Sequence, residues 1–118
     1  MNTDPYNAEV RRRFAEPRHA GVADTAVRRS GQGVDIELSA AVDDARIAAM
    51  RFRVYGCPHT VAACDAVCEA LEGGPLAAMQ GFALGSVMRS LSVPVEKTGR
   101  ILVLEDALRD LSSLLETS

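Results

Sequence analysis

Three cysteines and a histidine, all within one short stretch, are the residues of this 118-residue chain best suited to chemistry. Cys57 follows Tyr55 and Gly56 and precedes Pro58, where a strand-like pattern stops and a helical pattern starts. Glycine interrupts regular structure and proline favours the first helical position, so Cys57 is expected at or beside a helix N-cap. Unpaired backbone N–H groups there favour the thiolate, which attacks electrophiles and binds metals. The alternative is an inert cysteine packed under a loop.

His59 lies in the first turn of the same predicted helix and forms a candidate metal pair with Cys57. It would either ligate the same ion or stabilise the thiolate. A zinc site at Cys57 and His59 would need completion by a distant residue such as Asp65, or by another subunit. The alternative for His59 is a surface residue beside a loop.

Cys64 and Cys68 are expected in the core and not at this site. They share a helical stripe with Val61 and Leu71, and free cysteine packs as a small hydrophobe. A helix rises about 1.5 Å per residue, so roughly 10 Å separates Cys57 from Cys64 along the axis. Metal–sulfur bonds of about 2.3 Å cannot join the two at one ion.

The elements that must position these residues follow from hydrophobic periodicity. Alternation of apolar and polar residues predicts strands over residues 25–30, 34–39 and 47–55, the first of them weak. Gly31-Gln32-Gly33 is typical of a tight hairpin turn, and Asp43-Asp44 of a second turn. The expected arrangement is an antiparallel meander with one face exposed to water.

Helical spacing predicts helices over residues 4–15, 58–72, 75–80, 83–91 and 99–116. In the first, Asp4-Pro5 is the expected start, Tyr6, Val10 and Phe14 the inner face, and Arg11–Arg13 the solvated side. Strands followed by helices predict an α+β fold, a three-stranded antiparallel sheet with helices packed on one face. Residues 1–118 are expected to form a single domain.

Composition excludes several classes of function. A net charge of −3 argues against a nucleic-acid partner, because phosphate binding needs a basic surface. No apolar run reaches the length of a membrane span, and residues 1–13 lack the apolar core of a secretory signal. An odd number of cysteines favours reduced thiols, so a cytoplasmic protein is expected. No motif of a hydrolase is present, and we do not expect an enzyme.

Three segments in order resemble one family, the IscU/NifU N-terminal scaffold proteins of iron–sulfur cluster assembly. Residues 14–21, FAEPRHAG, are similar to the Y-x-N-P-R-N-x-G segment of that family. Residues 52–57, FRVYGC, are similar to its F-x-x-Y-G-C strand end, and residues 104–108, LEDAL, to the A-E-D-A-I of its last helix. The resemblance covers nearly the whole chain and implies the α+β plan derived above.

The resemblance also implies a ligand set, which this chain has largely lost. The family brings together three cysteines and one aspartate. Here Gly31 and Gly33 stand at the first cysteine and the aspartate, Cys57 is kept, and Arg100 stands at the third cysteine. Of the chaperone-docking segment L-P-P-V-K, residues 93–97 keep only the proline and the lysine. Iron–sulfur clusters are usually held by four thiolates. Because the ligand set of this chain is incomplete, the expected cofactor is an iron–sulfur cluster, zinc, or none.

Arg100 would place a fixed positive charge where the family has a thiolate, and this charge could pair with an anion or lower the pKa of Cys57. The first functional hypothesis is a divergent scaffold-like protein that transfers sulfur or iron through Cys57. Its implied partners are a cysteine desulfurase or an assembly chaperone, and a homodimer is possible. The alternatives are a non-catalytic binding module that regulates such a partner, and a zinc-binding variant.

Overall fold

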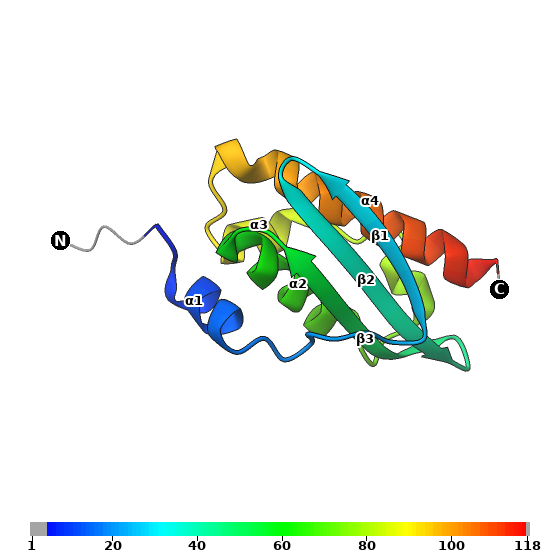
Figure 1. Ribbon diagram of the computed structural model, residues 1–118. Helices are drawn as coiled ribbons and strands as arrows, with labels where there is room; N and C mark the ends of the chain where they lie inside the picture. Colours follow the sequence, from blue (N-terminus) through cyan, green and yellow to red (C-terminus); the bar gives the residue numbers. More distant parts are fainter. Residues whose placement is uncertain (1–4, 118) are drawn as a thin grey trace.

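The computed structural model describes residues 5–117, which form a three-stranded sheet with helices packed against one of its faces (Figure 1). The predicted α+β fold is confirmed. In chain order the elements are α1 (Ala8–Ala15), β1 (Thr25–Gly31), β2 (Val34–Asp43), β3 (Arg46–Tyr55), α2 (Pro58–Leu71), the 3-10 turn η1 (Leu76–Met79), α3 (Gly85–Ser90), η2 (Val95–Lys97) and α4 (Thr98–Glu116).

The sheet is an antiparallel meander in the order β1-β2-β3. Gln32 and Gly33 form the turn between β1 and β2, and both have positive φ, as the favoured two-residue hairpin requires. α4 packs on β1 and β2, and α2 packs on β3, so the helices cover one face and leave the other open (Figure 1). The meander with one face exposed to water is therefore confirmed.

The covered face of the sheet supplies much of the core. β2 contributes alternate buried side chains, namely Val34, Ile36, Leu38 and Ala40. In β3, Ile47 and Met50 are both buried although they are three residues apart. The register shifts opposite Ala41 and Val42 of β2, because Ala41 pairs with Ala49 and Val42 pairs with Ile47. The extra residue of this β-bulge therefore lies in β3, and it turns Ile47 and Met50 to the same face.

Cys64 and Cys68 lie in this core and are fully buried, as predicted. Burial raises the pKa of both thiols, with nearby acidic groups adding to the effect. A thiol that stays protonated is a poor nucleophile. Both cysteines therefore act as packing residues of α2.

The first helix differs from its prediction. Asp4, expected at its start, lies outside the described residues, and α1 begins at Ala8 with the Asn7 side chain accepting a hydrogen bond from the Val10 N–H at 2.9 Å. Phe14, expected on the inner face, is 50% exposed. Arg13, expected on the solvated side, is buried instead. The helix is short, and it turns Val10 and Arg13 toward α2.

Other boundaries shift by a few residues. β2 continues to Asp43, so the second turn consists of Asp44 and Ala45, both with positive φ. The segment predicted as a helix over residues 75–80 is the 3-10 turn η1, and the one predicted over residues 83–91 shortens to α3. Within residues 5–117, no helix is both long enough and apolar enough to cross a membrane.

Candidate functional site

Cys57 is the N-cap residue of α2, with Pro58 at the first helical position, as the sequence predicts. Its backbone is extended, with φ −79° and ψ 165°, and the side chain is partly exposed. The Sγ atom lies 3.3 Å from the Thr60 hydroxyl. The Thr60 N–H donates to the Cys57 carbonyl at 3.0 Å, and this N–H also favours the ionised sulfur.

The surroundings of Cys57 favour the thiolate. Partial burial raises the pKa of the thiol, but four groups act against it: the hydroxyl and N–H of Thr60, the guanidinium of Arg100 and the ammonium of Lys97. Together they lower the pKa of Cys57 from 9.0 to about 7. A large share of Cys57 is therefore ionised at neutral pH, whereas the two buried cysteines stay protonated. Arg100 lowers the pKa of Cys57, which is the direction expected from the sequence.

The hairpin, the end of β3 and the start of α4 meet around this thiol. A Cβ at Gly99 would lie 3.2 Å from the Gln32 side chain, which places the β1–β2 turn against the first turn of α4. A Cβ at Gly56 would lie 2.9 Å from Val34, the first residue after that turn. The positions that the resemblance assigned to the family's ligands thus lie at one end of the molecule. Only Cys57 among them carries a donor atom for a soft metal.

His59 is fully buried, so the surface alternative is wrong. Its Nδ1 accepts a hydrogen bond from the Lys97 ammonium at 3.0 Å, and the ring packs on Tyr6 with centroids 4.7 Å apart. Its buried Nε2 has no hydrogen-bond partner among the described residues. Burial lowers the pKa of His59, and the charges of Lys97 and Arg100 lower it further, so the ring is neutral. Its clearest role is to orient Lys97, which also lies 5.1 Å from the Tyr6 ring centroid.

Asp65, suggested as a completing zinc ligand, is occupied elsewhere. It is buried in the middle of α2, and its carboxylate accepts hydrogen bonds from Arg13 at 2.7 Å and from the backbone N–H groups of Arg18 and His19. Among residues 5–117, no three or more His, Cys, Asp or Glu side chains are grouped to hold a metal ion. The described residues therefore bring no third donor to Cys57 and His59.

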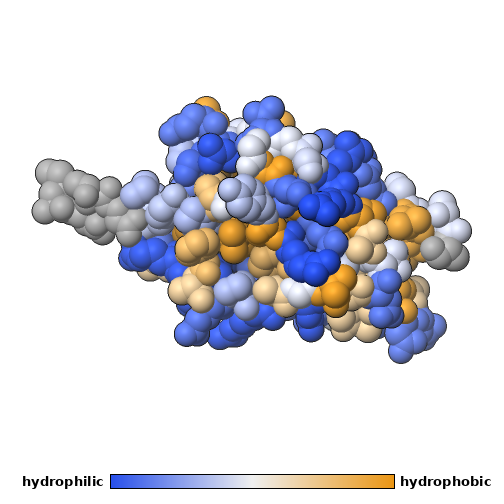
Figure 2. Space-filling model, in the orientation of Figure 1, coloured by the Kyte–Doolittle hydropathy of each residue, from blue (hydrophilic) through white to orange (hydrophobic). Residues whose placement is uncertain are grey.

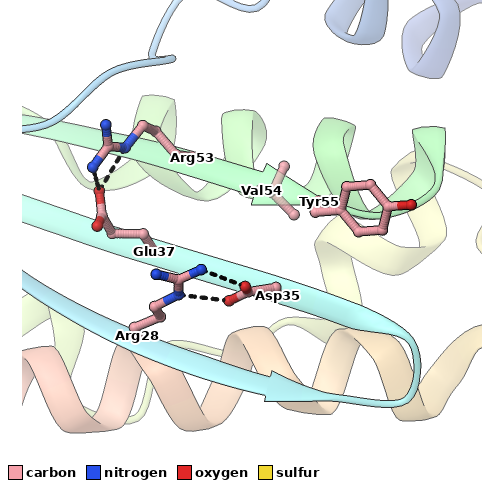
Figure 3. A pocket seen from close by; sticks show the side chains of 6 residues that line it. All are labelled: Arg28, Asp35, Glu37, Arg53, Val54 and Tyr55. Carbon is pink, nitrogen blue, oxygen red and sulfur yellow. Dashed lines mark hydrogen bonds and ion pairs between the residues drawn. The ribbon is translucent and has the colours of Figure 1, made fainter.

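The open face of the sheet carries a shallow pocket of about 230 Å³ beside this site (Figure 3). Arg28 pairs with Asp35, and Arg53 pairs with Glu37, so both guanidinium groups are already compensated. Tyr55 closes the pocket at the end of β3 and points away from both pairs (Figure 3). Polar residues with interspersed apolar ones cover this side of the molecule (Figure 2).

Comparisons with known proteins agree with this geometry. A family model described as the NifU-like N terminal domain matches residues 5–111. The chain belongs to this family. NifU-like domains are scaffolds, which agrees with the prediction that this chain is not an enzyme. No curated protein matches the sequence significantly.

Several solved structures share the fold. One is described as an iron–sulfur cluster assembly scaffold protein for the SUF system of the thermophile Fervidobacterium islandicum AW-1. It has a TM-score of 0.71 and 14% identity, over 92% of this chain and 96% of that one. The N-terminal part of a nitrogen-fixing NifU-like protein from Brucella abortus has a TM-score of 0.73 and 10% identity, over 95% of this chain and 94% of that one. A third structure, described as a hypothetical protein, has a TM-score of 0.63 and 22% identity, over 86% of this chain and 95% of that one.

Sequence reasoning missed two residues of the site. Thr60 was not singled out, although the third residue after an N-cap faces the cap and commonly takes part in capping. Lys97 belongs to the eroded docking segment and is the sole lysine in a chain that otherwise uses arginine. That bias in composition does not indicate a position beside Cys57. The approach of Lys97 to residues 57–60 is a tertiary contact and has no local pattern.

Proposed function

We propose that this chain is a divergent NifU-like protein that carries sulfur on Cys57 during iron–sulfur cluster assembly. One arrangement supports this above all: the partly exposed Cys57 thiol stands at the N-cap of α2, 3.3 Å from the Thr60 hydroxyl. Together with Arg100 and Lys97, Thr60 lowers the pKa of this thiol to about 7. Sulfur acceptors need a nucleophilic thiolate at neutral pH. The family membership supplies the wider context of cluster assembly.

The transfer step needs only Cys57 and a persulfide donor. The Cys57 thiolate attacks the outer sulfur of a persulfide on a cysteine desulfurase. A new S–S bond forms at Cys57, the S–S bond of the donor breaks, and the donor cysteine leaves as a thiolate. No electrons are gained or lost overall, so no further oxidant is required. Arg100 and Lys97 stabilise the negative charge on the acceptor before and after transfer.

A resident cluster does not fit the residues present. Gly31 and Gly33 offer no side-chain donor, and Arg100 brings a positive charge that cannot ligate iron. Cluster iron is normally held by four protein ligands, mostly thiolates. One thiolate leaves most coordination positions of a cluster open to water. A cluster held by this chain alone therefore has no part in the proposed function.

The proposal is tested by loading the reduced protein anaerobically with a cysteine desulfurase and cysteine. Mass spectrometry of peptides should find one added sulfur atom on Cys57 and none on Cys64 or Cys68. The Cys57→Ser variant, which keeps the size and shape of the side chain, should stay unmodified. An unmodified wild-type protein, with the desulfurase active on another acceptor, contradicts the proposal.

A second candidate function is a non-catalytic module that binds a desulfurase or an assembly chaperone and regulates it. The specific observation in its favour is the loss of ligand atoms at Gly31, Gly33 and Arg100 in a fold that is otherwise retained. Under this function, Cys57→Ser should still bind and regulate the partner.

Metal analysis of the same anaerobic preparations tests the zinc-binding alternative. This alternative requires about one zinc ion per Cys57–His59 pair and the loss of that zinc in Cys57→Ser.

A further inference from the structure

The two cations beside Cys57 differ from most basic side chains of the molecule. Arg13, Arg29 and Arg53 each form an ion pair with a carboxylate. Within the described residues, neither Lys97 nor Arg100 has a carboxylate partner. Lys97 contacts the neutral His59 ring and Arg100 approaches the thiol. One of the two charges suffices to balance a thiolate, so among residues 5–117 a second positive charge has no negative partner.

This excess of charge is held in place beside the β1–β2 turn. The bond from Lys97 to the buried His59 fixes the ammonium at 3.0 Å, and both cations are half-buried. The adjoining hairpin carries no Cβ at Gly31 or Gly33, and a Cβ built at Gly33 would touch nothing within 4 Å. Partly buried charges are screened less by salt than exposed ones. The site is therefore prepared to attract a small anion next to the sulfur.

We propose that Cys57, Lys97 and Arg100 form a binding site for a small sulfane-sulfur dianion of the thiosulfate type, from which Cys57 takes sulfur without a protein donor. This rests on the proposed sulfur-carrying function and names a substrate class for it. A neutral donor has no need of a second cation. A dianion does, because a thiolate repels it at contact distance unless positive charges offset the repulsion.

The reaction is balanced in atoms and charge. The Cys57 thiolate attacks the outer sulfur of thiosulfate and forms a new S–S bond. The S–S bond of thiosulfate breaks, and its electron pair leaves with sulfite. One monoanion and one dianion give a persulfide monoanion on Cys57 and a sulfite dianion. Arg100 and Lys97 would stabilise the sulfite as the negative charge moves onto it.

The test compares two reactions of the same thiolate in each variant. One is sulfur transfer from thiosulfate, followed by sulfite release and by persulfide on Cys57. The other is alkylation by iodoacetamide, which is uncharged. Changes in the pKa of Cys57 alter both rates through the same thiolate fraction, so the ratio of the two rates cancels them. The ratio therefore reports only the interaction with the anion.

We expect the ratio to fall about tenfold in Arg100→Gln and in Lys97→Gln, the effect of one lost charge-assisted contact. Arg100→Lys keeps the positive charge and should keep most of the wild-type ratio. A high ratio in this variant also shows that a substitution at position 100 does not unfold the protein. Arg109→Gln is the matched control, because it removes an exposed charge from the same helix roughly 13 Å away. Sulfate should compete with thiosulfate and leave alkylation unchanged.

The outcomes separate this inference from the proposed function. Unchanged ratios in Arg100→Gln and Lys97→Gln, or no persulfide from thiosulfate, overturn the anionic donor. Persulfide formation from the desulfurase in the same preparation would then leave sulfur carriage by Cys57 intact. If neither donor modifies Cys57, both proposals fail.

Discussion

Helix α2 carries two clusters of charge, and they differ in one respect. In the middle of the helix, Asp65 and Glu69 meet Arg13 of α1, and every charge has an opposite partner. At its start, Cys57 faces Lys97 and Arg100, whose charges no carboxylate among residues 5–117 balances. Buried charges are tolerated only when they are paired, so the first cluster is structural. Positive charge beside an accessible thiol, without a carboxylate to balance it, favours the nucleophilic thiolate.

The cluster in the middle of α2 attaches the N-terminal part of the chain to this helix. Arg13 donates to Asp65 at 2.7 Å and to Glu69 at 2.8 Å, while the carboxylate of Asp65 also accepts the N–H groups of Arg18 and His19. Burial lowers the pKa of Arg13, but the hydrogen bonds that it donates to Glu69, Asp65 and Glu9 outweigh burial and raise the pKa. The guanidinium therefore stays charged, and the cluster depends on its carboxylates.

The largest predicted effect breaks this cluster. Asp65→Asn leaves the buried Arg13 without its closest counter-charge, and we expect a loss of about 3–5 kcal/mol in the free energy of unfolding. Urea denaturation measures it. The matched control is Glu69→Gln, because the Glu69 side chain is 47% exposed and the pair should contribute less than about 1 kcal/mol. Equal losses in both variants would mean that burial of Asp65 does not matter.

The next effect concerns the reactive cluster. In Arg100→Gln the pKa of Cys57 should rise from about 7 toward 9.0, because one of the groups that lower it is gone. The measurement is the rate of iodoacetamide alkylation against pH. The free energy of unfolding should change by less than about 1 kcal/mol, since no ion pair with a carboxylate is lost. An unchanged alkylation profile would remove Arg100 from the site.

The dependence of stability on pH is a third way to separate the clusters. The folded-state pKa of Cys57 lies below its ordinary value, so its thiolate stabilises the folded state fully above pH 9.0. This stabilisation is lost as the pH falls through about 7. The wild type should therefore gain stability relative to Cys57→Ser as the pH rises from about 7 to 9.0, as measured by urea denaturation. A constant difference would contradict the lowered pKa.

The last prediction concerns the group nearest the sulfur within the reactive cluster. Thr60→Val removes the hydroxyl that lies 3.3 Å from the sulfur, and this hydroxyl lowers the pKa of Cys57 more than Arg100 does. The pKa should therefore rise at least as far in Thr60→Val as in Arg100→Gln, as measured by iodoacetamide alkylation against pH. Thr60→Ser keeps the hydroxyl and should leave the alkylation profile near that of the wild type. A smaller rise in Thr60→Val than in Arg100→Gln would place the main source of thiolate stabilisation in α4 and not in α2.

Much of the fold was predictable from local patterns. The alternation in residues 34–38 identified the central strand, and the helical stripe placed Cys64 and Cys68 in the core. Gly56 and Pro58 located Cys57 at the N-cap. These features depend on period and on capping preferences, which a few neighbouring residues express. The α+β plan followed from the order of the elements.

The partners of each charged residue were not predictable in the same way. Within the arginine triplet, Arg13 looked solvated and is buried, because α1 turns it onto Asp65 fifty-two positions away in the chain. His59 was expected either beside Cys57 as a metal ligand or at the surface, and it is instead buried against Tyr6 and Lys97. The sequence by itself determined where Cys57 sits on its helix. The family resemblance placed Arg100 near the thiol. Only the tertiary structure decided that Lys97 joins it, because Lys97 reaches the thiol through long-range packing that no local pattern records.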